Sequence, residues 1–150
     1  MALALIIGLS LGFVSILFSR SVKQLDETTF YGLMLAVIGA LYVGFTWTDT
    51  TSFIINCIQC FFFGSLAYFG IRKSMYFMAA GFMLHGAFDV VYSLFPVPDL
   101  RPPHYDVFCI SVDWVIGFYL FIITYRQMNA ITKDPGCHLP AKRLNNIIIN

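Results

Sequence analysis

Five long apolar segments, separated by short polar stretches, limit the folds that this sequence can adopt. They cover residues 2–19, 30–47, 52–70, 74–95 and 107–125. A helix that crosses a lipid bilayer needs about 20 mostly apolar residues, and it satisfies its backbone polar groups internally. Only 11% of the residues are charged, against about 25% in soluble domains. The pattern predicts an all-α membrane protein with five transmembrane helices.

The basic residues predict how the helices are oriented. Cytoplasmic loops of membrane proteins are enriched in lysine and arginine. Arg101 would lie alone on one side of the membrane, and the other eight basic residues would share the opposite side: Arg20, Lys23, Arg72, Lys73, Arg126, Lys133, Lys142 and Arg143. We therefore expect the N-terminus outside the cell and the C-terminus in the cytoplasm. Residues 1–125 would form one domain in the cell membrane, most simply a bacterial inner membrane, and residues 126–150 a cytoplasmic tail.

Ionisable side chains inside two of the predicted helices mark a candidate site. His85 and Asp89 lie one turn apart in segment 74–95, and Asp113 lies in segment 107–125. At about 1.5 Å per residue, both aspartates fall roughly 9 Å below the same membrane surface. Ionisable residues at such depth are costly and usually functional. We expect these three residues to form a catalytic or metal-binding site that opens toward the outside.

The chemistry of the three side chains suits a divalent metal ion. Two neighbouring carboxylates require a proton or a cation between them, and a histidine beside an aspartate keeps one ring nitrogen free as a base or ligand. His104, in the proline-rich loop 96–106, is a candidate acid or further ligand, and the loop is a candidate lid. The flanking residues Tyr92, Tyr105 and Cys109 are candidates for substrate contact, and Asn56 and Gln59 for hydrogen bonds to the same region.

The stretch HGAFDVVYSLFP, followed by a proline loop and CISVD, resembles a group of small bacterial membrane proteins of unknown function. The resemblance covers residues 81–117. It implies that His85, Asp89, Cys109 and Asp113 belong together, and it implies no activity. Tyr92 and Ser93 stand where the group's pattern leads us to expect histidine.

Two further motifs have a structural and a functional interpretation. Cys57 and Cys60 have a C-x-x-C spacing that occurs in redox-active pairs, but two small residues of a phenylalanine-rich helix are the simpler interpretation. Gly8 and Gly12 form a G-x-x-x-G pair, a spacing that lets membrane helices approach closely. The pair would join two helices of one chain or two chains of a homodimer.

Three classes of function follow from these features. The leading hypothesis is a membrane site for a cation or polar head group, with metal-assisted or acid–base hydrolysis of a lipid-like substrate as its chemistry. The alternatives are a proton-coupled transport or relay subunit, in which Asp89 and Asp113 carry the proton, and a structural protein whose polar residues only join helices. The net charge of +1 and the lack of a basic stripe argue against nucleic-acid binding.

Overall fold

Five α-helices make up the described part of the chain, in agreement with the predicted number. The structure, a computed structural model, describes residues 1–22, 26–94 and 101–133, and all regular structure in these ranges is helical. The helices are α1 (Ala2–Ser21), α2 (Glu27–Phe45), α3 (Thr50–Arg72), α4 (Met75–Tyr92) and α5 (Tyr105–Lys133). Each is long and apolar enough to span a membrane. This confirms the prediction of five helices that are long and apolar enough to span a membrane.

Polar caps decide where α2 and α3 begin. The Asp26 carboxylate accepts a hydrogen bond from the backbone N–H of Thr29 at 3.1 Å, and the Asp49 carboxylate accepts one from that of Ser52 at 2.8 Å. Each bond satisfies a backbone donor that the first helical turn leaves unpaired. Both helices therefore begin slightly earlier than their apolar segments, inside the polar stretches.

The ends of α4 and α5 differ more from the predicted spans. α4 ends at Tyr92 rather than at residue 95. α5 continues beyond its predicted end at Tyr125 and includes residues as far as Lys133. The start of the predicted tail is thus helical, whereas residues 134–150 lie outside the described part of the chain.

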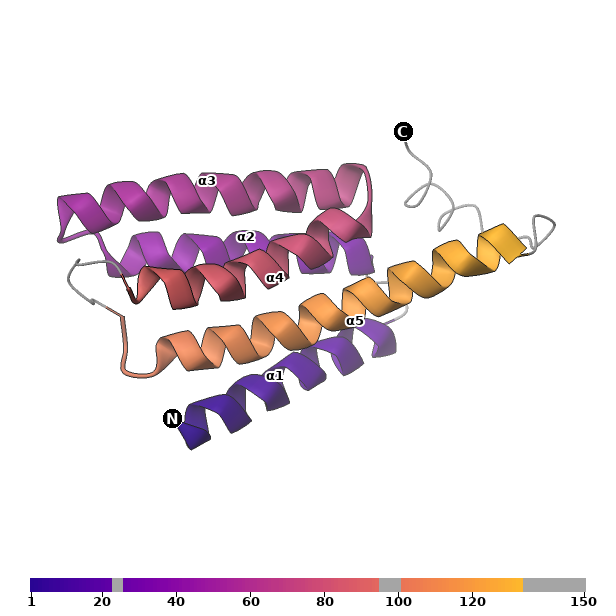
Figure 1. Ribbon diagram of the computed structural model, residues 1–150, viewed down its shortest axis with the longest axis horizontal. Helices are drawn as coiled ribbons and strands as arrows, with labels where there is room; N and C mark the ends of the chain where they lie inside the picture. Colours follow the sequence, from indigo (N-terminus) through magenta and orange to yellow (C-terminus); the bar gives the residue numbers. More distant parts are fainter. Residues whose placement is uncertain (23–25, 95–100, 134–150) are drawn as a thin grey trace.

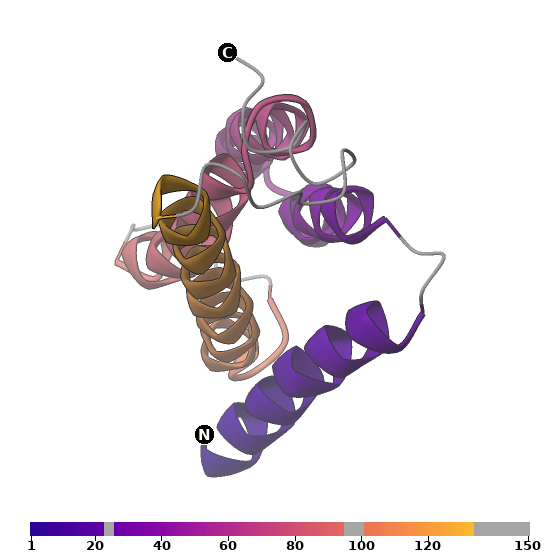
Figure 2. The same ribbon diagram turned by 90° about the vertical axis from the view of Figure 1, so that its right-hand side faces the viewer.

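The helices alternate in direction, and α4 lies at the centre of the packing. It packs mainly on α5 and α3 and also touches α2, while α2 packs along α3. α1 lies against α5 and runs in the same direction, on the side of the molecule away from α3 (Figures 1 and 2). Half of the α4 span is buried, compared with 17% of the α1 span. Side chains on α4 are therefore the ones best placed for an enclosed site.

Gly8 and Gly12 join α1 to α5 of the same chain. A Cβ atom at Gly8 would lie 2.6 Å from the carbonyl oxygen of Phe108, and one at Gly12 would lie 3.0 Å from Val115. The absence of a side chain thus permits the close approach that the spacing predicts. Self-association through this pair stays a prediction, and in the single chain both glycines face α5.

An apolar core fills the bundle on one side of the candidate site. Its fully buried members come from α2, α4 and α5: Tyr31, Leu35, Met78, Phe82, Ile116 and Leu120. Large apolar side chains also cover the outside, as with Phe61, which is 80% exposed. An apolar exterior around a packed interior is what a lipid solvent favours, because outward-facing apolar groups carry no cost there.

Candidate functional site

Three ionisable side chains meet inside the bundle between α4 and α5. His85 and Asp89 lie one turn apart on α4, and Asp113 lies opposite them on α5. His85 Nδ1 is 2.8 Å from Asp113 Oδ2 and 4.0 Å from Asp89 Oδ2. All three residues are fully buried, and one potential ligand atom from each lies within 4.8 Å of the others. We call these three residues the His–Asp cluster.

Glycines allow α4 and α5 to approach closely beside the cluster. A Cβ atom at Gly86, next to His85, would lie 2.7 Å from Trp114 Nε1. A Cβ atom at Gly117 would lie 2.9 Å from Met83 Sδ. Both distances are shorter than van der Waals contact allows, so larger residues would displace a neighbouring side chain or separate the helices. The short contact between the two helices in the cluster therefore depends on small residues on both sides.

Tyr42 of α2 connects the cluster to a basic residue at the end of the bundle. The Tyr42 hydroxyl donates a hydrogen bond to Asp89 Oδ1. Arg101 Nη1 donates in turn to Tyr42 Oη at 3.4 Å. The Arg101 guanidinium carbon also lies 4.9 Å from the centroid of the Tyr92 ring, within range of a cation–π attraction. A positive charge thus lies near the buried carboxylates, separated from them by one tyrosine.

Aromatic rings enclose the imidazole of His85. The ring centroids of Phe63, Tyr42 and Phe88 lie 4.8, 5.8 and 6.5 Å from that of His85. Such rings exclude bulk water and lower the local dielectric constant. Electrostatic interactions inside the cluster are therefore stronger than they would be at a surface, and an unbalanced charge there is more costly.

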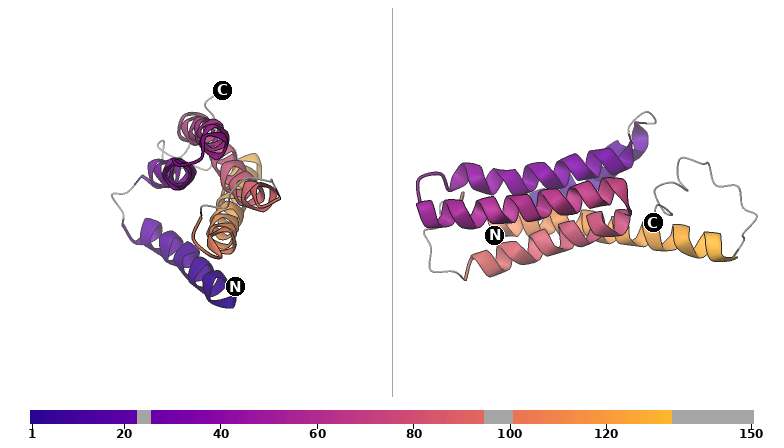
Figure 3. Two further views of the ribbon diagram at one scale, coloured as in Figure 1. Left: turned by 90° about the vertical axis from the view of Figure 1, so that its left-hand side faces the viewer. Right: turned by 90° about the horizontal axis from the view of Figure 1, so that it is seen from above.

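The α3 helix adds neutral polar groups to the same half of the bundle. The left view of Figure 3 shows the helices from this end. Asn56 Nδ2 donates to Tyr92 Oη at 3.1 Å and to Thr46 Oγ1 at 3.3 Å. Gln59, one turn further along α3, is 5% exposed, and neither atom of its amide has a hydrogen-bond partner in the protein. The prediction of hydrogen bonds in this region is thus confirmed for Asn56, but not for Gln59.

Buried polar atoms without a protein partner are concentrated in this region. There are seven such side-chain atoms among the described residues: Ser52 Oγ, Asn56 Oδ1, Gln59 Nε2 and Oε1, His85 Nε2, Asp89 Oδ2 and Asp113 Oδ1. A buried polar atom left unsatisfied costs about 1–3 kcal/mol, and native proteins contain few of them. Three of the seven belong to the His–Asp cluster. The arrangement suits a protein that binds a proton, a cation or water here.

The comparisons with known proteins give a family. Residues 3–126 match the family of unknown function DUF6010. The chain belongs to this family. The DUF6010 match runs from the start of α1 into α5, so it contains the whole His–Asp cluster. It agrees with the resemblance to proteins of unknown function noted over residues 81–117, and it assigns no activity. No curated protein and no solved structure matches the chain.

Three other predicted site residues of this DUF6010 protein lie near the cluster: Tyr92, Tyr105 and Cys109. Tyr92 and Cys109 are buried, and the half-buried Tyr105 has its ring centroid 5.9 Å from that of Tyr42. His104 is exposed, and with a φ of 63° it occupies the left-handed region where α5 begins. Of the loop proposed as a lid, residues 96–100 lie outside the described residues.

Cys57 and Cys60 are half-buried free thiols on α3. They are not joined by a disulfide, and neither belongs to the group of potential metal ligands found in the described residues. Nothing in their surroundings adds support to the redox interpretation.

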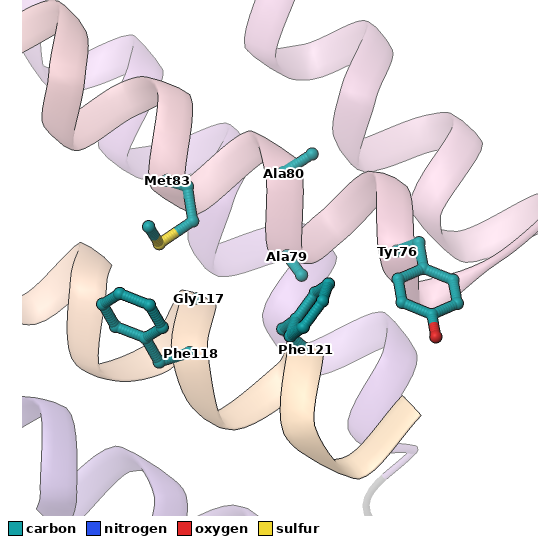
Figure 4. Close-up of a pocket in the computed structure, with 7 residues that line it drawn as sticks. All are labelled: Tyr76, Ala79, Ala80, Met83, Gly117, Phe118 and Phe121. Carbon is teal, nitrogen blue, oxygen red and sulfur yellow. The ribbon is translucent and has the colours of Figure 1, made fainter. Parts of the chain in front are cut away.

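A separate hollow of about 510 Å³ lies between α4 and α5, and none of the three cluster residues lines it. Figure 4 shows its lining, in which Met83 and Phe118 face each other across the two helices and Tyr76 lies at one end. Its other lining residues are Ala79, Ala80, Gly117 and Phe121. Apart from the Tyr76 hydroxyl, the lining offers no polar side-chain group, so this hollow suits a lipid chain and not the chemistry of the cluster.

Proposed function

We propose that this protein is a multi-pass membrane protein whose activity depends on a divalent cation bound by His85, Asp89 and Asp113. The observation that carries the proposal is the burial of three potential ligands, one atom of each lying within 4.8 Å of the others. Two ionised carboxylates in a region of low dielectric constant are stable only when positive charge balances them. A divalent cation would balance both at once.

The donor set also limits which cation fits. One imidazole nitrogen and two carboxylate oxygens suit zinc, manganese or iron(II), whereas soft ions prefer sulfur ligands. Three protein ligands leave one coordination position open, as in catalytic metal sites and unlike closed structural ones. Tyr42 would act as an outer partner, because its hydrogen bond fixes one oxygen of Asp89 and leaves the other facing His85.

The chemistry that we propose for the site is metal-assisted hydrolysis of a lipid-like substrate. When bound, the ion would activate a water molecule for attack on an ester or phosphoester. His85 would hold the ion, and Asp113 Oδ1, the oxygen of that carboxylate without a partner in the protein, would accept the proton released by that water. Tyr92, Tyr105 and Cys109 would contact the substrate at the end of the bundle. His104 would have to reorient to act as an acid or ligand.

The proposed location is the cell membrane, with the cluster in the outer half of the bilayer. Arg20, Arg72 and Lys73 lie at the ends of α1 and α3, on the side of the bundle opposite Arg101, which interacts with Tyr42. Because cytoplasmic loops are enriched in basic residues, this distribution supports an external N-terminus and a cytoplasmic C-terminus.

Elemental analysis tests the metal site directly. We would purify the wild type, Asp113→Asn and Asp106→Asn in mild detergent without chelator. Asp106 lies in the first turn of the same helix but outside the cluster, so its variant is the matched control. We expect near-stoichiometric zinc, manganese or iron in the wild type and in Asp106→Asn, and loss of the metal in Asp113→Asn. Wild-type protein without metal, even after incubation with each ion, would contradict the proposal.

Proton transfer is the second candidate, because hydrogen bonds connect several groups of the site. Tyr42 donates to Asp89, and His85 is bonded to Asp113, with 4.0 Å between His85 and Asp89. A proton could move along such a series by small side-chain displacements. Proteoliposomes with an internal pH dye would test it: proton uptake that Asp89→Asn abolishes, in protein without metal, would favour this function over the first.

A further inference from the structure

We propose that one face of α3, formed by Ser52, Asn56 and Gln59, binds a file of water molecules that leads from the end of the bundle to the His–Asp cluster. We call it the α3 water path. The path extends the proposed function, because it would supply the cluster with water or protons. This role of the path rests on the proposed metal site. The existence of the path rests on separate observations.

The three residues lie on a single stripe of the helix and are all buried. Their spacing of four and three residues places them on one face. Ser52 and Asn56 are fully buried and Gln59 is 5% exposed. From Ser52 to Gln59 the helix rises about 10 Å, so the stripe extends from the first turn of α3 well into the bundle.

Two contacts between α3 and α4 show that the stripe reaches the level of the cluster. Asn56 is hydrogen-bonded to Tyr92, and further along α3 the Phe63 ring lies 4.8 Å from that of His85. Because α3 and α4 run in opposite directions, Gln59 lies between these two contacts, as Asp89 does on α4. The path therefore ends beside the cluster and not at a distant part of the core.

The unsatisfied atoms of this face require a hydrogen-bonding ligand. Ser52 Oγ, Asn56 Oδ1 and both amide atoms of Gln59 have no hydrogen-bond partner in the protein. Within a membrane, polar groups have no bulk water to bond to, so leaving them unsatisfied costs several kcal/mol each. The amide of Gln59 needs both a donor and an acceptor, and water supplies both.

The charge of the face selects water over an ion. Ser52, Asn56, Gln59 and the neighbouring hydroxyls of Thr46 and Tyr92 are all neutral. The charged groups lie at the two ends of the path: Asp49 and Arg101 at the outer end, at the Ser52 backbone N–H and over the Tyr92 ring, and the cluster at the inner end. Between these ends, a bare ion would lack a compensating charge. A buried water typically makes two to four hydrogen bonds, and this face supplies donors and acceptors at intervals of about one turn. The ionic chemistry is thus confined to the cluster, and the path carries a neutral molecule.

Hydroxyl-radical footprinting tests the path, since radicals formed from bound water oxidise aromatic side chains beside it. The chain offers residues of similar burial for comparison. Tyr92 is bonded to Asn56, and Phe63 lies at the edge of the apolar core one turn beyond Gln59, whereas Tyr31 and Phe82 lie elsewhere in that core. We expect oxidation of Tyr92 and Phe63 to exceed that of Tyr31 and Phe82 several-fold in the wild type. In Gln59→Met, which removes an amide without protein partners, oxidation of Phe63 should fall to the level of Phe82.

Oxidation of Tyr92 and Phe63 no greater than that of Tyr31 and Phe82 would overturn the proposal. So would a Gln59→Met variant with a raised Tm and an unchanged oxidation pattern, because the amide would then be a buried group that binds nothing. Ser52→Ala provides a second variant, in which oxidation of Tyr92 should fall. Metal content is measured on the same samples. Oxidation of Tyr92 and Phe63 in protein without metal would contradict the metal site but not the path. Bound metal without such oxidation would contradict the path but not the metal site.

Discussion

His85 Nδ1 lies 2.8 Å from Asp113 Oδ2, and this contact joins α4 to α5 across 28 residues of sequence. It is fully buried and lies where Gly86 lets the two helices approach closely. The contact therefore has two possible roles. It holds two helices together, and it fixes the positions of two potential ligands of one cation. Stability and metal binding can be measured independently, which makes the roles distinguishable.

A double-mutant cycle on His85 and Asp113 should show strong coupling. We expect His85→Leu and Asp113→Leu to lower the free energy of unfolding by about 3–5 kcal/mol each, because each leaves a buried polar partner unpaired. The double variant should lose clearly less than the sum, since no unpaired partner remains. Unfolding in detergent measures all four proteins. Thr124→Val is the control, because Thr124 is buried on α5 but bonds only within its own helix; additive effects for His85 and Asp113 would contradict the coupling.

Metal binding should release protons and strengthen as the pH rises. His85 Nδ1 and Asp113 Oδ2 share a proton at 2.8 Å, and a cation bound between them must displace it. For each proton displaced, the apparent affinity should rise about tenfold per pH unit until the group is deprotonated in the free protein. Calorimetry in buffers of different ionisation enthalpy counts the protons. Affinity that is independent of pH would mean that the cation binds elsewhere.

Tyr42→Phe should weaken the metal site with little change in the fold. The variant removes the donor to Asp89 Oδ1 and frees that carboxylate to rotate. Loss of such an outer partner typically costs 10–100-fold in metal affinity, so we expect a loss of about that size. Tyr31→Phe is the matched control, because Tyr31 is equally buried on α2 but bonds Ser19, away from the cluster. Equal effects of the two variants would show that Tyr42 acts only through stability.

The apolar segments could be predicted from the sequence because their length alone decides whether a helix spans a bilayer. Their ends were predicted less well, since the caps Asp26 and Asp49 lie in the polar stretches that hydropathy assigns to loops. The proximity of Asp89 and Asp113 could also be predicted, because two helices joined by a short loop run in opposite directions and equal distances along them give equal depth.

Tyr42 shows where prediction from the sequence failed, whereas the role of His104 stays a prediction. Tyr42 was missed because tyrosine is common near membrane surfaces for other reasons. A signal was present, since Tyr31, Leu35 and Tyr42 form one stripe of α2 that is entirely buried. The position of His104 in the loop predicts that it lies beside the cluster. The direction of its side chain depends on a left-handed backbone conformation, which cannot be predicted from a histidine in the sequence.

Alanine at Gly8 should destabilise the protein, whereas alanine at Gly44 should not. A Cβ atom at Gly8 would lie 2.6 Å from the Phe108 carbonyl oxygen and would push α1 away from α5, while one at Gly44 meets nothing within 4 Å. In a helix, replacing an unhindered glycine with alanine stabilises by roughly 0.5–1 kcal/mol. We therefore expect a lower Tm for Gly8→Ala and an unchanged or higher Tm for Gly44→Ala. Equal Tm values would show that α1 does not depend on its packing against α5.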